Sequence, residues 1–168
     1  FGAKGVIVHG GSVGEGGDIS EGYDNWRKAL EHVEDTGMKV LVENTAGGKN
    51  SVARYMDSIE RLWEVIGHLN VGLCLDTCHT WAGGIPTIDA VKGFKKLVKK
   101  IDLIHFNDSK DGFESSRDRH ENLGKGKIPK EELEYVIKNA KTDIIVETPN
   151  GPDAQKKDIA WIRRRLKK

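Results

Sequence analysis

The sequence lacks an excess of charge of one sign, and it lacks a hydrophobic run long enough to cross a membrane. Its 27 Lys and Arg residues and 26 Asp and Glu residues give a net charge of +1. No global field therefore points to a polyanionic partner, and affinity for nucleic acid would have to come from local patches or bound metal. A spanning helix needs about 20 mostly apolar residues, and no signal peptide is apparent. We expect a cytoplasmic protein with no membrane partner.

Cysteine is also scarce. The two cysteines, Cys74 and Cys78, flank the end of one apolar run. A disulfide over so short a span at a strand end is geometrically awkward, so we expect both thiols to be reduced and packed. The glycine-rich stretch HGGSVGEGGDIS lacks the GxxxxGK[ST] spacing of a phosphate-binding loop, so its glycines alone identify no ligand.

What is present is an alternation of apolar runs with helical patterns along 168 residues. This alternation predicts a parallel sheet with helices outside it. A complete (β/α)8 barrel typically needs about 250 residues. We therefore predict one α/β domain over residues 1–168, an incomplete TIM barrel of about five units whose N-terminal units are absent. The start at Phe1, without Met, also indicates a fragment. The expected strands are residues 5–9, 39–45, 71–77, 103–107 and 143–148, and the expected helices are 21–36, 51–69, 88–100, 130–140 and 153–166.

Each expected strand has a histidine or a carboxylate at or near its C-terminal end. Parallel strands place these ends on one rim, which is where α/β barrels build their sites. One such ending is commonplace, but a repeated one indicates a metal cluster, and a polar loop adds a D-x-H pair. Nitrogen and oxygen donors suit Zn²⁺ or Mn²⁺, and one carboxylate can bridge two ions about 3.5–4 Å apart. The candidate ligands are His9, Glu43, Asp76, His79, His105, Asp118, His120 and Glu147.

Five stretches carry a family resemblance: VLVENTAGG, GLCLDTCHTWAGG, IHFNDSK, RDRHENLGKGKI and IVETP. In this order they resemble the successive motifs of the endonuclease IV family, the zinc-dependent apurinic/apyrimidinic endonucleases of base excision repair. The resemblance runs from Val6 to Leu166, and DTCH and DRHxxLGxGxI are its most specific parts. It implies a TIM barrel that bends DNA, flips the abasic nucleotide out and hydrolyses the phosphodiester on its 5′ side.

The resemblance also implies a site for three zinc ions. Glu43 would bridge two of them, and both Glu43 and Glu147 would be catalytic. Asp76, His105 and Glu147 would complete the first of the bridged zincs. His9 would serve the second.

The third zinc of the resemblance would be held by His79, Asp118 and His120. The first motif departs from the family, which usually shows HPG followed by another His, whereas this chain has HGGSVGEG. The family also supplies a further His ligand and its DNA-penetrating residues from N-terminal units. We therefore expect two well-ligated zincs in this chain and an under-ligated position at His9, with Mn²⁺ as an alternative metal.

The expected partner is double-stranded DNA with abasic sites, together with a missing N-terminal segment or a second copy. Arg117 and Arg119 lie beside the predicted cluster and are candidates for phosphate contacts, although both could simply be solvated. Asp108 is interpreted as a turn residue or a residue that supports a ligand, rather than as a ligand itself.

Two alternatives stay open. A sugar isomerase or epimerase of the related xylose-isomerase-like barrels needs one divalent metal, for which Glu43, Asp76, His105 and Glu147 would suffice. Such an enzyme has no need of the additional ligand set around His79. The second alternative is a barrel fragment that keeps metal sites but has no turnover.

Overall fold

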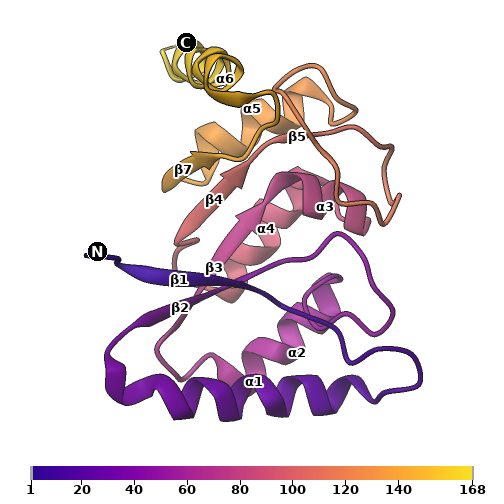
Figure 1. The fold of residues 1–168 in the computed structure, drawn as a ribbon, viewed down its shortest axis with the longest axis vertical. Helices are drawn as coiled ribbons and strands as arrows, with labels where there is room; N and C mark the ends of the chain where they lie inside the picture. Colours follow the sequence, from indigo (N-terminus) through magenta and orange to yellow (C-terminus); the bar gives the residue numbers. More distant parts are fainter. Residues whose placement is uncertain (1, 168) are drawn as a thin grey trace.

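The computed structural model describes residues 2–167, so Phe1 and Lys168 lie outside the described residues. Five parallel strands form one curved sheet in the order β1-β2-β3-β4-β7 (Figure 1). This confirms the predicted α/β class and the incomplete TIM barrel. The strands are β1 (Gly5–His9), β2 (Lys39–Glu43), β3 (Val71–Asp76), β4 (Leu103–Phe106) and β7 (Asp143–Val146).

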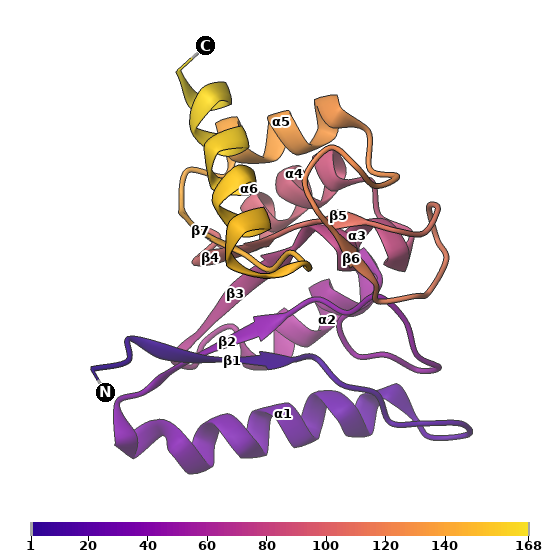
Figure 2. The same cartoon turned by 45° about the horizontal axis from the view of Figure 1, so that its top comes forward.

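All of the longer helices cover the outer face of the sheet, and each of these packs against the next one in that layer, whereas the short α3 lies at the C-terminal rim of the sheet (Figure 2). An amphipathic pattern explains this layer, because each helix buries one apolar stripe against the strands. The helices are α1 (Ile19–Val33), the 3-10 turn η1 (Glu34–Thr36), α2 (Met56–Ile66), α3 (Thr77–Gly83), α4 (Thr87–Leu97), α5 (Lys130–Asn139) and α6 (Gly151–Leu166). No helix among residues 2–167 is long and apolar enough to span a membrane.

The register of the sheet brings polar residues together at one edge. His9 pairs with Glu43 across β1 and β2, and Asp76 pairs with His105 across β3 and β4. Glu147 directly follows β7, whose last residue lies opposite the end of β4. Four of the strands therefore deliver a histidine or a carboxylate to one rim, and the fifth does so one residue later.

Two predictions of local structure near this rim were wrong. The second helix begins at Met56 rather than at residue 51, because residues before it use their main chain elsewhere: Val52 N donates to Gly11 O at 2.9 Å, and Ala53 O accepts from Thr45 N at 2.8 Å. The loop expected after the third strand instead forms α3, which Asp76 caps by accepting a hydrogen bond from His79 N at 2.7 Å.

The long polar loop also contains regular structure. Strands β5 (Asp108–Ser109) and β6 (His120–Glu121) form a short antiparallel ribbon. The Asp108 carboxylate is fully buried and accepts four main-chain N–H bonds, from the residues Ser109, Gly124, Gly126 and Ile128. Burial raises the pKa of Asp108. Its neighbour Gly126 has no room for a side chain, because a Cβ would lie 2.3 Å from Asp108 Oδ1.

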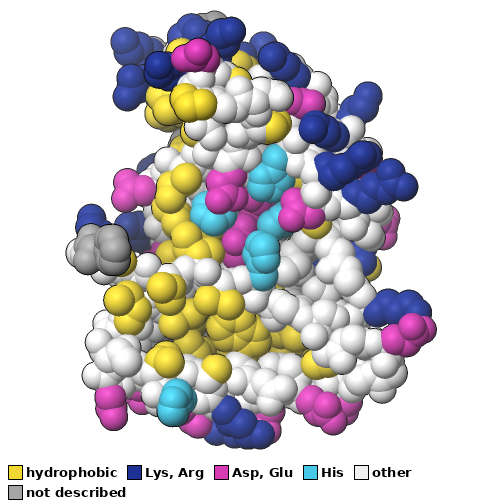
Figure 3. Space-filling view, in the orientation of Figure 1, with side chains coloured by type: hydrophobic (Ala, Val, Ile, Leu, Met, Phe, Trp, Pro, Cys, Tyr) yellow, Lys and Arg dark blue, Asp and Glu magenta, His cyan; other side chains and the backbone are white. Residues whose placement is uncertain are grey.

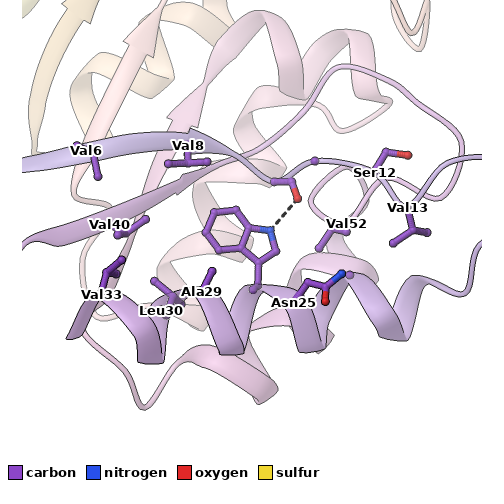
Figure 4. Close-up of a pocket in the computed structure, with 14 residues that line it drawn as sticks. Val6, Val8, Ser12, Val13, Asn25, Ala29, Leu30, Val33, Val40 and Val52 are labelled. Atoms are coloured by element: carbon purple, nitrogen blue, oxygen red, sulfur yellow. Dashed lines mark hydrogen bonds between the residues drawn. The ribbon is translucent and has the colours of Figure 1, made fainter. Parts of the chain in front are cut away.

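Both edges of the sheet are open within the described chain. Strand β1 pairs only with β2, and β7 pairs only with β4. Val6 and Val8 on β1 are 45% and 44% exposed, and Ile145 on β7 is 47% exposed. A groove of about 460 Å³ between β1 and α1 continues this apolar surface (Figure 4). Trp26 is among its lining residues and donates its indole N–H to Gly10 O at 2.8 Å. An arc of five strands thus exposes surface that a closed barrel buries.

Candidate metal centre

Histidine and acidic side chains gather in a hollow above β1, beside the broad apolar area of the open edge (Figure 3). The structure brings all of the sequence-predicted ligand residues into one continuous network, in which each has a donor atom within 4 Å of a donor atom of another. Its members are His9, Glu43, Asp76, His79, His105, Asp118, His120 and Glu147.

Glu43 lies at the centre of this network and is 3% exposed. Its Oε1 is 2.9 Å from His105 Nδ1 and 3.5 Å from His79 Nδ1, whereas its Oε2 is 3.4 Å from His9 Nε2. The two oxygens therefore face different histidines. A carboxylate in this position has the geometry to bridge two metal ions.

One group of donors converges beside Glu43. The ligand atoms of Glu43, Asp76, His105 and Glu147 all lie within 4.8 Å of one another. His105 Nδ1 is 3.2 Å from Glu147 Oε2. Burial alone would lower the pKa of His105, but the hydrogen bond to Glu43 and the nearby carboxylate charges raise it above its usual range. Three carboxylates and one imidazole could hold a divalent cation here.

A second group is centred on Asp118, which comes from the long loop. Its Oδ2 is 3.1 Å from His79 Nε2, and its Oδ1 is 3.1 Å from His120 Nε2. The His120 and His79 rings beside it hold the pKa of Asp118 far below its usual range, because they favour the charged carboxylate. The donors of Asp76, His79 and His120 also lie within 4.8 Å of one another, as do those of Cys78, Asp118 and His120. Asp76 and Cys78 therefore adjoin this group.

The His79 ring shows how well the second group fits a cation. Its Nδ1 lies 2.9 Å from the main-chain oxygen of Asn44, which can only accept, so Nδ1 carries a proton and Nε2 is the bare nitrogen of the neutral ring. Nε2 is buried and makes no hydrogen bond among residues 2–167, although Asp118 Oδ2 is close by. A buried, unpaired imidazole nitrogen facing a carboxylate is the arrangement of a metal ligand.

Asp76 is oriented by two asparagines that sequence reasoning missed. Asn44 accepts from Asp76 N at 2.8 Å, and Asn107 donates to Asp76 Oδ2 at 2.7 Å while accepting from Cys78 N at 2.7 Å. Each asparagine directly follows the end of a strand, within the stretches VENT and HFND. That position was the available signal, because a buried amide there reaches the neighbouring strand.

The structure also places the two cysteines and the two arginines that the sequence analysis singled out. Cys74 and Cys78 are free and buried, as predicted, and burial raises the pKa of Cys78 to about 12. Arg119 binds Asp111 with Nε 2.7 Å from Oδ2, and Arg117 approaches the same carboxylate at 3.7 Å. Both arginines remain more than half exposed. Their phosphate contact stays a prediction.

With this fold and this rim, the chain belongs to the xylose isomerase-like TIM barrel family, which it matches over residues 1–165. The predicted resemblance to endonuclease IV is confirmed. The probable endonuclease 4 of Mycobacterium ulcerans is 47% identical over 166 residues, which are 99% of this chain and 65% of that protein. The probable endonuclease 4 of Mycobacterium tuberculosis is 49% identical over 165 residues, which are 98% of this chain and 64% of that protein.

Solved structures agree with this placement. Endonuclease IV from Thermus thermophilus superposes with a TM-score of 0.75 at 29% identity, covering 99% of this chain and 62% of that one. A D-tagatose 3-epimerase-like protein superposes with a TM-score of 0.71 at 20% identity over 97% of this chain and 62% of that one, and shares the fold. The chain spans about 65% of the length of the curated relatives it matches.

Proposed function

We propose that this chain is the metal-binding part of a zinc-dependent endonuclease that hydrolyses the phosphodiester 5′ to abasic sites in double-stranded DNA. The observation that carries the proposal is the second donor group, His79 with Asp118 and His120, placed against the group around Glu43. A site for a single metal would need only the group around Glu43. The relatives named endonuclease 4 support the same reaction.

In this proposal the two groups divide the metals between them. Glu43, Asp76, His105 and Glu147 would hold one zinc, and His79, Asp118 and His120 another. His9 and the second oxygen of Glu43 would give a third position with too few protein ligands in this chain. Zinc bound at these positions would supply Lewis acidity toward phosphate oxygens. Mn²⁺ accepts the same donors.

Glu43 and Glu147 would have different chemical roles. Glu43 is buried among three histidines and would fix the spacing of the cations. The Glu147 side chain is 39% exposed and stands beside His105, so it can reach an incoming water and accept its proton. Arg117 and Arg119 would contact flanking phosphates, but Arg119 must first exchange Asp111 for the phosphate.

We also propose that a further part of a barrel covers the open β1 edge and its groove. The exposed valines of β1, the unpaired strand edge and the 65% share of the relatives' length support this. That part would be an N-terminal segment of barrel units or a second copy of the chain. DNA binding specific for abasic sites would depend on it.

The test is complementation. The chain is mixed with the N-terminal part of an endonuclease 4 relative and zinc, and nicking of a duplex with one abasic site is measured. Nicking should require both parts, and Glu43→Ala or Glu147→Ala should abolish it. Lys125→Ala, an exposed change on the same loop as Asp118, should leave it intact. A well-folded, zinc-loaded complex that leaves the abasic duplex whole would overturn the proposal. Isomerisation of a sugar by that complex would favour the single-metal alternative.

A further inference from the structure

Helix α6 carries one buried carboxylate that faces inward. Asp158 is 4% exposed, and none of the ion pairs among residues 2–167 includes it. It accepts hydrogen bonds from Asn122 Nδ2 at 2.7 Å, from Thr148 Oγ1 at 2.7 Å and from Leu123 N at 3.1 Å. A carboxylate without a cation is costly to bury, and these three donors are what satisfies it.

The donors come from two segments that also contact each other directly, through Asn122 and His120. Asn122 and Leu123 follow His120 in the long loop, and Thr148 directly follows Glu147 at the end of β7. Asn122 strengthens the link by donating to Pro149 O at 3.1 Å, also beyond β7. Asp158 therefore ties the segment that carries His120 to the segment that carries Glu147.

The two tied residues belong to different donor groups of the metal centre. His120 lies in the group of Asp118, whereas Glu147 lies in the group of Glu43. They touch directly, because His120 Nδ1 is 2.7 Å from the main-chain oxygen of Glu147. This contact fixes the His120 ring with Nε2 toward Asp118. The geometry of this contact depends on both the His120 segment and the Glu147 segment staying in place.

We propose that Asp158 is a positioning residue that sets the relation between the two donor groups by clamping the loop of His120 onto the end of β7. The inference rests on the proposed metal function. Asp158 touches no donor atom of the cluster, and it acts through Asn122, Leu123 and Thr148.

Simple stabilisation accounts poorly for this arrangement. A buried carboxylate with no cation stabilises a fold less than a well-packed apolar side chain of similar volume does. The same helix buries Trp161 and Ile162, so it has apolar anchoring already. What an apolar residue at position 158 could not do is hold an amide, a hydroxyl and a main-chain N–H from two segments in one fixed geometry.

The experiment measures zinc affinity by competition with a chromogenic chelator, on the folded chain. Asp158→Asn and Asp158→Ala should weaken zinc binding by about 10–100-fold, the usual cost of losing a supporting residue of a metal site. Thr148→Val should weaken it less, and Thr148→Ser, which keeps the hydroxyl, should restore it. The Thr148 pair keeps the test usable if the Asp158 variants fail to fold.

The matched control is Asp102→Asn. Unlike the buried Asp158, Asp102 is only partly buried and is paired with Lys39; it accepts a main-chain N–H from Leu73 at 3.1 Å and lies before β4, at the opposite end of the strands. It should lower the melting temperature and leave zinc affinity unchanged. Equal zinc affinity in the native chain and both Asp158 variants would overturn the positioning role alone. A native chain that binds no zinc would instead overturn the proposed function.

Discussion

His79 Nδ1 donates a hydrogen bond to the main-chain oxygen of Asn44 over 2.9 Å, which turns His79 Nε2 toward Asp118. One peptide group at the end of β2 thus selects the tautomer of a histidine on α3. The bond joins the donor group around Glu43, the residue before Asn44, to the donor group around Asp118. Each group nevertheless has ligands of its own, so changes in one group should alter its metal content separately from that of the other.

Metal content is the first prediction. Elemental analysis after dialysis should give about two zincs per chain, because two donor sets lie wholly within it. His120→Ala should remove one zinc and keep the other, and Glu147→Ala should do the converse. His32→Ala, an exposed change on α1, serves as the control. A native chain with almost no zinc would contradict the ligand assignment, and three tight zincs would require a donor outside it.

The second prediction concerns pH. His79 is buried; burial lowers its pKa, but the charges of Asp76, Asp118 and Glu43 outweigh that effect and raise it to about 9, above the ordinary 6.5. The metal-free fold gains stability from this proton fully below about pH 6.5 and loses it as the pH rises through about 9. Zinc must displace the same proton, so zinc affinity should rise with pH across that window.

Thermal unfolding of the metal-free chain and chelator competition, both at several pH values from about 6 to 9, measure the two trends. They should run in opposite directions. His79→Gln removes the titrating ring and should flatten the stability trend. A zinc affinity that is independent of pH would show that His79 is neutral before the metal binds.

Much of this site could be predicted from the sequence because its main rule is local. A parallel strand with His9, Glu43 or His105 at or next to its C-terminal end delivers that side chain to the rim whatever the rest of the chain does. The D-x-H pair of Asp118 and His120 lies in the long polar loop, where no strand end fixes its position. Its assignment to a metal therefore came from the family resemblance.

The supporting residues could not be predicted in the same way. Helix α2 begins later than predicted because Val52 donates its main-chain N–H to Gly11, far away in the sequence, and Ala53 O accepts from Thr45 N. Asp158 looks like an ordinary polar residue of an amphipathic helix, and its role appears only once α6, β7 and the long loop are assembled. Long-range contacts of this kind leave no periodic pattern.

The third prediction concerns DNA. The isolated chain should bind duplex DNA weakly, with a steep loss on adding salt and little preference for an abasic site, since only phosphate contacts are available. Arg117→Ala should reduce the salt slope by about one ion. Arg119→Ala should change it less, because Asp111 already holds that guanidinium. Filter binding at several salt concentrations measures both, and strong abasic preference in the isolated chain would contradict the prediction.

The last prediction concerns the open edge. Val8 is 44% exposed on a strand with one free side, and the apolar groove beside α1 extends that surface. An unpaired apolar strand edge promotes association, and a lysine on it opposes pairing. Val8→Lys should therefore shift the isolated chain toward monomer in analytical ultracentrifugation. Ile159→Lys is the matched control, since Ile159 is 37% exposed but lies on α6, away from β1. Adding the N-terminal part of a relative should produce the same shift in the native chain, because it would occupy that edge. If the native chain is monomeric at all concentrations and does not bind the added part, the β1 surface is not an interface.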